Sequence, residues 1–183
     1  MTDKYTVHQR ISRHIKETPY ITKGVNLCRL PNGKRCMGCC GLDFAKDTTN
    51  KRPFIEGMVQ SRDELKQYKD KWDYKRRVRP EDLYPCGQCK QLVVEEDGTV
   101  DELVKKKHVC FTCPLHPAQN NGKEMRVGEC DTDFMCESQH AWASWDESER
   151  DAFLKFIESK NLDWFEYSKQ MNNNSLLNEF LNT

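Results

Sequence analysis

The residues of this chain best suited to chemistry are its ten cysteines. Four of them fall within the thirteen residues "CRLPNGKRCMGCC", and Cys39 and Cys40 are adjacent. Thiols at this density can form disulfides, ligate a metal ion, hold an iron–sulfur cluster or supply a reactive nucleophile. The spacing of the cysteines and the character of the rest of the chain separate these possibilities.

Most of the cysteines occur as pairs with two residues between them. The three Cys-x2-Cys pairs are Cys36 with Cys39, Cys86 with Cys89, and Cys110 with Cys113, and the other cysteines are Cys28, Cys40, Cys130 and Cys136. This spacing lets a tight turn direct two sulfurs at one metal ion. Three such pairs in one chain indicate metal binding.

The two central pairs have the order Cys86-x2-Cys89-x20-Cys110-x2-Cys113, which is close to a zinc-ribbon pattern. Four thiolates at about 2.3 Å from Zn²⁺ would close a tetrahedral site of structural character. The alternative is that the two pairs belong to different sites, because spacing in the sequence does not specify pairing in space. Both interpretations stay open.

The N-terminal group of cysteines has a different character. Adjacent cysteines rarely both face one ion, because neighbouring side chains diverge. Cys39 and Cys40 therefore favour a polynuclear cluster or two neighbouring sites, and iron–sulfur clusters are usually held by four cysteine thiolates. The candidate cluster ligands are Cys28, Cys36, Cys39 and Cys40. Lys34 and Arg35 can offset part of the negative charge that such a site collects.

The stretch "CMGCC" resembles the end of the C-x2-C-x2-C-C signature of the zinc- or iron-chelating family, whose members are often described as iron–sulfur cluster-containing proteins. "YPCGQCKQL" and "CPLHPAQNNGKEMRVGECDTDFMC" are similar to later segments of that family, so the resemblance spans residues 28–140. The chain departs from the signature at Gly33, where the family has its first cysteine. Cys28 would then substitute from further upstream.

The resemblance implies metal or cluster binding, with an iron–sulfur cluster, zinc or both as the cofactor and a role in redox chemistry or metal handling. The ligands that it implies are Cys36, Cys39, Cys40, Cys86, Cys113, Cys130 and Cys136; the ribbon spacing adds Cys89 and Cys110, and local clustering adds Cys28. Flagellin lysine N-methylase is related to this family, so a cluster-dependent, methyltransferase-like enzyme is one alternative. A zinc-ribbon module that binds nucleic acid or protein is the other.

No residue is singled out as catalytic. A cysteine nucleophile would need one accessible thiol of low pKa among ten, and nothing distinguishes one. The motifs GxGxxG, P-loop, HExxH and GxSxG do not occur, so nucleotide-binding and hydrolase interpretations lack support. His116, in "CPLHP", is a metal ligand, a hydrogen-bond partner of a ligand sulfur, or a structural residue of the turn.

The composition of the 183 residues favours metal as a source of stability. The chain is hydrophilic, with a mean hydropathy of −0.88, 32% charged residues and no net charge. A small apolar core is expected, and metal ligation can supplement it. The charged first twenty residues lack the apolar run of a signal peptide, and no stretch is long enough to span a membrane. We therefore expect a cytoplasmic protein whose thiols stay reduced.

Helices are expected on both sides of the cysteine-rich segment. The first covers 3–17 and ends before Pro19. The second covers 62–77, with Ser61 and Glu64 as the capping box at its start.

A hairpin turn is expected at Asp97-Gly98, between the two halves of the ribbon pattern. Ser144 and Glu147 have the spacing of another helix start. "NLDWFEYSKQM" and "NSLLNEFLN" are typical of two further short helices.

These expectations combine into an α+β fold, a small irregular metal-stabilised domain with flanking helices. Residues 1–27 would form an N-terminal helix and lead-in, 28–140 the cysteine-rich domain, and 141–183 a helical cap. The aromatic, acidic C-terminal segment packs over the core or binds a protein partner. "KQYKDKWDYKRRVRP" mixes basic and aromatic residues, but its aspartates and the chain's pI of 6.9 favour a solvated helix over nucleic-acid binding.

Overall fold

The computed structural model describes residues 26–45, 47–78 and 82–183, and over these ranges the fold is a mixture of helices and one two-stranded sheet. This agrees with the expected α+β class. The helix expected over 3–17 lies outside the described residues. Among the helices that the structure describes, none is long and apolar enough to cross a membrane.

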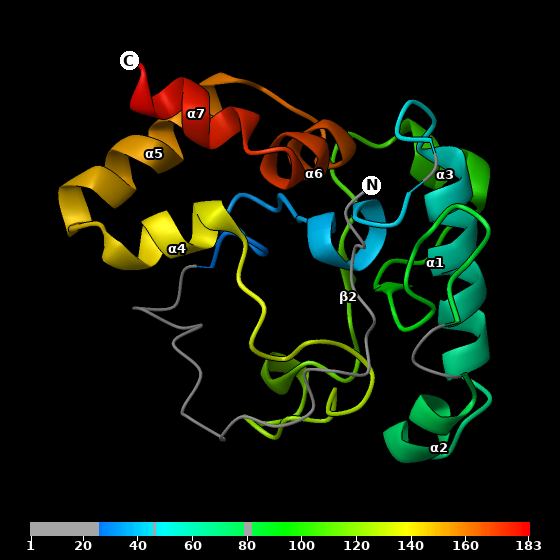
Figure 1. Cartoon of the computed structure of the whole chain (residues 1–183). Helices are drawn as coiled ribbons and strands as arrows, with labels where there is room; N and C mark the ends of the chain where they lie inside the picture. Colours follow the sequence, from blue (N-terminus) through cyan, green and yellow to red (C-terminus); the bar gives the residue numbers. More distant parts are fainter. Residues whose placement is uncertain (1–25, 46, 79–81) are drawn as a thin grey trace, which may run out of the picture.

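The elements, in chain order, are the π-helical turn η2 (Gly38–Leu42), α1 (Arg52–Leu65), α2 (Lys71–Arg76), β1 (Val93–Val94), α3 (Val100–Lys105), β2 (Phe111–Thr112), the 3-10 turn η3 (Pro117–Gln119), α4 (Glu137–Ser144), α5 (Glu147–Ser159), α6 (Trp164–Asn172) and α7 (Ser175–Leu181). Strands β1 and β2 pair antiparallel. Figure 1 shows α4 to α7 grouped on one side and α1 to α3 on the other, with β2 and much of the loop structure between the groups. The cysteine-bearing loops therefore connect the two helical groups.

The expected second helix was wrong at both ends. Helix α1 begins at Arg52, with Pro53 in its first turn, where the missing N–H of proline costs no hydrogen bond. Ser61 lies inside α1, fully buried, and its hydroxyl donates to the carbonyl of Lys90 at 2.8 Å. Its apparent capping pattern is therefore a tertiary contact. Asp70 instead caps α2 by accepting from two backbone N–H groups.

Two other expected features, a helix start and a hairpin turn, also differ from the structure. The capping box of α5 is Asp146 with Glu149, and Ser144 is the last residue of α4. The turn at Gly98 does not close a hairpin directly, because Thr99 caps α3, which stands between the two strands. The two short C-terminal helices, α6 and α7, are confirmed.

Buried apolar side chains form two main clusters, and helix α6 contributes to both. The first cluster comprises Met37, Leu42, Phe54, Ile55, Met58, Leu92, Val94, Leu103, Val109, Phe111, Trp164 and Phe165. The second comprises Leu27, Leu30, Trp142, Phe153, Ile157, Tyr167, Met171 and Leu176. The C-terminal aromatic residues thus fill the interior together with residues of the cysteine-rich segment, which favours the packing role over a partner surface.

Helix α6 also holds the first cysteine loop by hydrogen bonds. The buried hydroxyl of Ser168 accepts the N–H of Met37 at 3.1 Å and donates to the carbonyl of Trp164 at 2.8 Å. The phenol of Tyr167 donates to the carbonyl of Leu27 at 2.7 Å. Both ends of the loop that carries Cys28 and Cys36 are therefore fixed to one helix.

Replacement of this serine is expected to loosen the loop. In Ser168→Ala the buried N–H of Met37 loses its acceptor, which is expected to cost about 1–2 kcal/mol in the free energy of unfolding, measured by urea denaturation. Ser144→Ala is the matched control: Ser144 also bonds a helix carbonyl, but it is exposed, so a change within about 0.5 kcal/mol is expected. Equal losses in the two variants would contradict the anchoring role.

The basic and aromatic stretch after α1 divides between interior and surface. Tyr74 is fully buried, and the guanidinium of Arg77 lies 3.7 Å from the centre of its ring. Arg77 also forms an ion pair with Glu64 at 2.8 Å. Trp72, on the outer face, is 40% exposed. Part of this stretch is therefore built into the fold and is unavailable to a ligand.

Candidate metal centre

The first cysteine segment folds back on itself and places Cys28 beside Cys36. The N–H of Cys36 donates to the carbonyl of Cys28 at 3.1 Å, and the N–H of Leu30 donates to the carbonyl of Lys34 at 3.0 Å. Gly33 occupies the loop with φ of +86°, a conformation that glycine adopts readily. The position where the family signature has a cysteine is thus a turn residue here, and Cys28 reaches Cys36 from the other arm of the loop.

Cys39 and Cys40 lie on the π-helical turn η2, with their sulfurs 3.8 Å apart. Met37 is fully buried beneath this turn. A Cβ at Gly41 would lie 2.0 Å from the methyl carbon of Met37, so a larger residue there would displace the end of the methionine side chain. Cys39 is exposed, whereas Cys40 is partly buried against the apolar cluster that includes Met37.

The turn that carries Cys86 and Cys89 docks against the first segment. The N–H of Cys89 donates to the carbonyl of Cys40 at 2.8 Å. Gly87, with φ of +98°, lets the two backbones approach closely, because a Cβ there would lie 2.2 Å from the carbonyl oxygen of Phe44. Cys89 is thereby held next to Cys40. The sulfur of Cys86 has different surroundings and lies 3.8 Å from the carbonyl of Pro53.

Cys110 and Cys113 flank strand β2, which occupies the two residues between them. In extended backbone, side chains at i and i+3 point to opposite faces. The sulfur of Cys110 lies 4.0 Å from a guanidinium nitrogen of Arg35, whereas Cys113 packs against a small cluster that contains Tyr74 and Leu115. This Cys-x2-Cys pair therefore does not form a metal-binding turn of the ribbon type.

The last two cysteines lie on the long loop between η3 and α4. The N–H of Cys130 donates to the carbonyl of Arg126 at 3.3 Å. Cys136 is the residue at the N-terminal cap of α4 and packs against the second apolar cluster, as Cys36 does. The end of the loop therefore returns to the first cysteine segment.

Backbone N–H groups point at four of the sulfurs. The N–H of Gly38 lies 3.4 Å from the sulfur of Cys36, and the N–H of Gln91 lies 3.4 Å from that of Cys89. Burial raises the pKa of both thiols, and these hydrogen bonds act against it. Burial also raises the pKa of the Cys113 and Cys136 thiols. The backbone N–H of Leu115 acts against this effect at Cys113, and those of Gln139 and Ser138 do so at Cys136. Such donors favour the thiolate, which is the form that ligates metal.

Mutual electrostatic effects show which sulfurs are neighbours. Around Cys28, close packing of protein atoms raises the pKa of the thiol, and the charges of Cys36, Cys39 and Cys136 raise it further. We call these four cysteines the first sulfur set: Cys28, Cys36, Cys39 and Cys136.

A second group surrounds Cys40. The hydrogen bond and charge of Cys39 raise the pKa of Cys40 most, and burial and the charges of Cys89 and Cys113 add to the effect. For Cys113, burial raises the pKa to about 12, with Cys89 and Cys130 contributing. The second sulfur set is therefore Cys40, Cys89, Cys113 and Cys130. Cys39 also acts on Cys89 and Cys130, so the two sets adjoin at the adjacent pair.

Arg126 supplies a positive charge to both sets. For Cys28, Cys113 and Cys130, burial raises the pKa of the thiol and the charge of Arg126 lowers it in part. For Cys39, the hydrogen bond with Cys40 lowers the pKa most, and the charge of Arg126 adds to this effect. The guanidinium is mostly buried and is held by Glu124 through contacts of 2.6 and 2.9 Å. Arg126 could not be predicted from the sequence, because a single arginine in an irregular loop forms no pattern.

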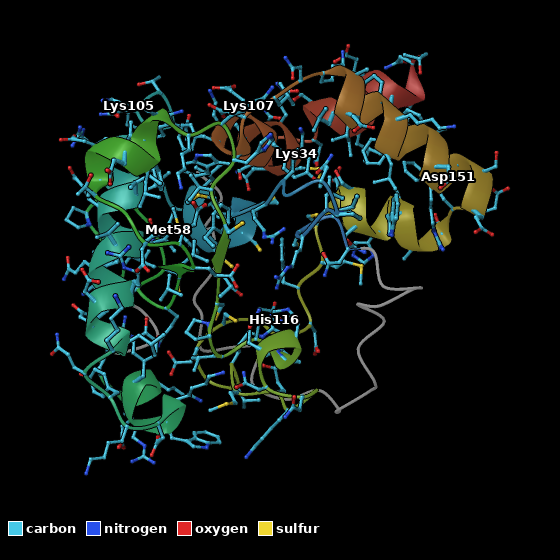
Figure 2. All side chains as sticks on the ribbon, turned by 180° about the vertical axis from the view of Figure 1, so that it is seen from behind. Lys34, Met58, Lys105, Lys107, His116 and Asp151 are labelled. Atoms are coloured by element: carbon cyan, nitrogen blue, oxygen red, sulfur yellow. The ribbon has the colours of Figure 1, made fainter. Side chains whose placement is uncertain are left out.

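Lys34 and Arg35, the two basic residues expected to offset the thiolate charge, have other neighbours. Arg35 reaches Cys110, and Lys34 is buried with its pKa lowered by burial and by the nearby Lys107. Figure 2 shows Lys34 and Lys107 at the opposite end of strand β2 from His116.

His116 has a structural role in its turn. Its Nδ1 accepts the N–H of Ala118 at 3.1 Å and so caps η3. Burial lowers the pKa of the imidazole to about 4, and the charge of Arg126 adds to this effect, so the ring is neutral at pH 7. Of the three roles that the sequence allows for His116, the geometry supports that of a structural residue of the turn.

Several cysteine sulfurs are neighbours, but within the described residues they do not converge on a position that a metal ion could occupy. All ten are free thiols. Within residues 26–45, 47–78 and 82–183, no three His, Cys, Asp or Glu side chains converge closely enough to hold a metal ion. Metal ligation would therefore require the cysteine side chains of a set to change rotamer so that their sulfurs turn inward.

No family model, no curated protein and no solved structure matches this chain. The resemblance to the zinc- or iron-chelating family rests on the cysteine motifs and their neighbouring residues alone.

Proposed function

We propose that this protein is a cysteine-rich metalloprotein that binds an iron–sulfur cluster, zinc, or both, with a role in redox chemistry or metal handling. The observation that carries the proposal is the gathering of eight cysteines from distant parts of the chain into two adjoining sets. In each set, two sulfurs receive backbone N–H groups. Donors of this kind stabilise thiolates and tune iron–sulfur clusters.

The chemistry of the donors selects the cofactor class. Both sets consist of thiols, and soft thiolate ligands suit Zn²⁺ and iron–sulfur clusters rather than Mg²⁺ or Ca²⁺. When bound, a cluster would supply one-electron transfer, whereas a zinc ion closed by four thiolates would be structural. Arg126 would offset part of the thiolate charge in either case.

The ribbon alternative has weaker support. It requires Cys86, Cys89, Cys110 and Cys113 to face one ion. Cys110 and Cys113 flank an extended strand, and Cys86 lies against Pro53, so only Cys89 and Cys113 are neighbours in a sulfur set.

The test is to purify the full chain without oxygen, record its visible spectrum, and measure iron, zinc and acid-labile sulfide per chain. A brown protein with stoichiometric iron and sulfide would support the cluster form of the proposal. A colourless protein with bound zinc would support the zinc form. A protein that contains neither metal and binds neither on anaerobic reconstitution would contradict the proposal.

A further inference from the structure

An open cavity of about 330 Å³ lies against the two-stranded sheet, where Val93, Val94 and Thr112 line it. Val93 of β1 pairs with Thr112 of β2, so their side chains share one face of the sheet. Val94 and Phe111 form the neighbouring pair, and their side chains belong to the first apolar cluster. Because successive side chains of a strand point to opposite faces, the cavity lies mainly on the sheet face that turns away from that cluster.

The end of helix α1 forms one wall of this cavity. Arg62, Leu65 and Lys66 are three and four residues apart, a spacing that places them on one face of the helix. Leu65 packs against the small apolar cluster that contains Val93. Pro114, from the loop after β2, adds further apolar surface. The inner part of the cavity is therefore apolar.

Lys71 marks the polar border of the cavity. Its ammonium donates to the carbonyl of Gln119 at 2.8 Å and to the side-chain oxygen of Asn120 at 2.9 Å, which ties the start of α2 to η3. Gln119 also lines the cavity. Both acceptors are neutral, and an ammonium has three N–H donors, so one donor and the full positive charge stay available. An anionic group in the cavity can accept from this donor.

The other charged residues of the lining have less to offer a ligand. Arg62 forms an ion pair with Asp63 at 3.0 Å, and Lys66 lies 3.6 Å from the same carboxylate. Glu95 is exposed, where water and salt screen its charge. Within the described part of the chain, Lys71 is thus the cation of this cavity that forms no ion pair.

We propose that this cavity binds a small amphiphilic anion, with a body of alkyl or aromatic carbon and one carboxylate. The body would lie against Leu65, Val93 and Pro114. The carboxylate would accept from Lys71, and the hydroxyl of Thr112 would be a second hydrogen-bonding group. Small-molecule pockets have volumes of about 300–1,000 Å³ and combine apolar walls with a few polar groups, as this cavity does. The inference goes beyond the proposed metal function and does not depend on it.

The test is an NMR titration of the isotope-labelled full chain, as purified, with octanoate as the probe. Saturable shifts of the amide signals of Val93, Thr112 and Gln119 are expected. Octanol has the same alkyl chain without the charge. It is expected to bind about tenfold more weakly, because a hydrogen bond to a charged group is lost. Equal affinities for octanoate and octanol would contradict the proposal, as would shifts confined to other parts of the chain.

Variants test the two halves of the cavity. Lys71→Met keeps the length of the side chain but removes the charge, so octanoate is expected to bind about tenfold more weakly and octanol as before. Leu65→Trp places a larger side chain in the apolar part and is expected to abolish binding of both. Lys75→Met is the matched control. Lys75 also lies in α2 and donates to a backbone carbonyl, that of Val127 at 2.6 Å, but it does not line the cavity.

The control is expected to bind octanoate and octanol as the unmodified chain does. Equal losses of octanoate affinity in Lys71→Met and Lys75→Met would overturn the inference. Undiminished binding by Leu65→Trp would also do so. Loss of both octanoate and octanol binding in Lys71→Met would show that this lysine holds the cavity wall at Gln119 rather than the ligand, which would contradict its assigned role.

Discussion

Chelation of the bound metal is expected to unfold residues 28–140. Apart from the 14-residue helix α1, the regular structure there is short, because the two strands have two residues each and helices α2 and α3 have six each. A structural zinc site in small peptides contributes about 10–16 kcal/mol. This equals or exceeds the entire stability of an ordinary domain, which is about 5–15 kcal/mol. Removal of such a site is therefore expected to leave too little favourable free energy for folding.

The measurement is far-ultraviolet circular dichroism and thermal melting of the full chain with increasing chelator. The control is the same chelator already saturated with zinc, which separates loss of metal from any direct effect of the reagent. We expect loss of helical signal and of a cooperative melting transition, both restored when zinc or iron with sulfide is returned. An unchanged spectrum and melting temperature after complete metal removal would contradict the role of metal in stability.

Unfolding is expected to spread into the C-terminal helices, because α6 is bonded to the first cysteine loop at Met37 and Leu27. Trp164, which lies in the first apolar cluster, reports on this spread. Part of α5 and α7 is expected to persist, since Phe153 and Phe180 pack together with ring centres 5.0 Å apart. A partial helical signal after chelation would thus come from this aromatic group.

The C-terminal helices could be predicted from sequence because their signals are local. Asp163 caps α6 directly, and the apolar residues that follow recur at helical spacing. Ser61 failed for the opposite reason. Its capping pattern is also local, but the residue is buried by contacts with Lys90 and Tyr84, which come from a segment more than twenty residues away. A short motif does not reveal such contacts.

The candidate site shows the same division. The spacing of the cysteines predicts that they are metal ligands, and this stays a prediction. It could not assign them to sets, because Cys28 reaches Cys36 through a folded loop and Cys89 reaches Cys40 through docking of a separate turn. The ribbon pattern suggested the wrong neighbours for Cys110, because two residues of strand lie between it and Cys113. Distance along the chain carried no information about these approaches.

Gly87→Ala is expected to destabilise the protein by about 2–5 kcal/mol, because it combines backbone strain with overlap between two backbones. The residue has φ of +98°, where an L side chain is strained. Its added Cβ would lie 2.2, 2.4 and 2.7 Å from backbone atoms of Phe44 and Ala45. Backbone atoms cannot move aside as a flexible side chain can. The docked turn must therefore shift, and Cys89 must shift with it.

Gly122→Ala is the matched control. Gly122 has φ of +82°, but nothing lies within 4 Å of its added Cβ, so only the conformational strain of about 1–2 kcal/mol is expected. Both variants are compared with the unmodified chain by urea denaturation in the presence of saturating zinc.

The two variants are also expected to differ in metal content. Displacement of Cys89 from Cys40 should weaken metal binding by these thiols, so Gly87→Ala is expected to bind Co²⁺, a visible probe of thiolate sites, less tightly than the unmodified chain does. Gly122→Ala is expected to bind Co²⁺ as tightly as the unmodified chain. Equal stability losses and equal cobalt titrations would show that the close approach of this turn to Phe44 does not position Cys89. A stability loss confined to Gly87→Ala, with cobalt binding unaffected, would separate the docking of the turn from ligand placement.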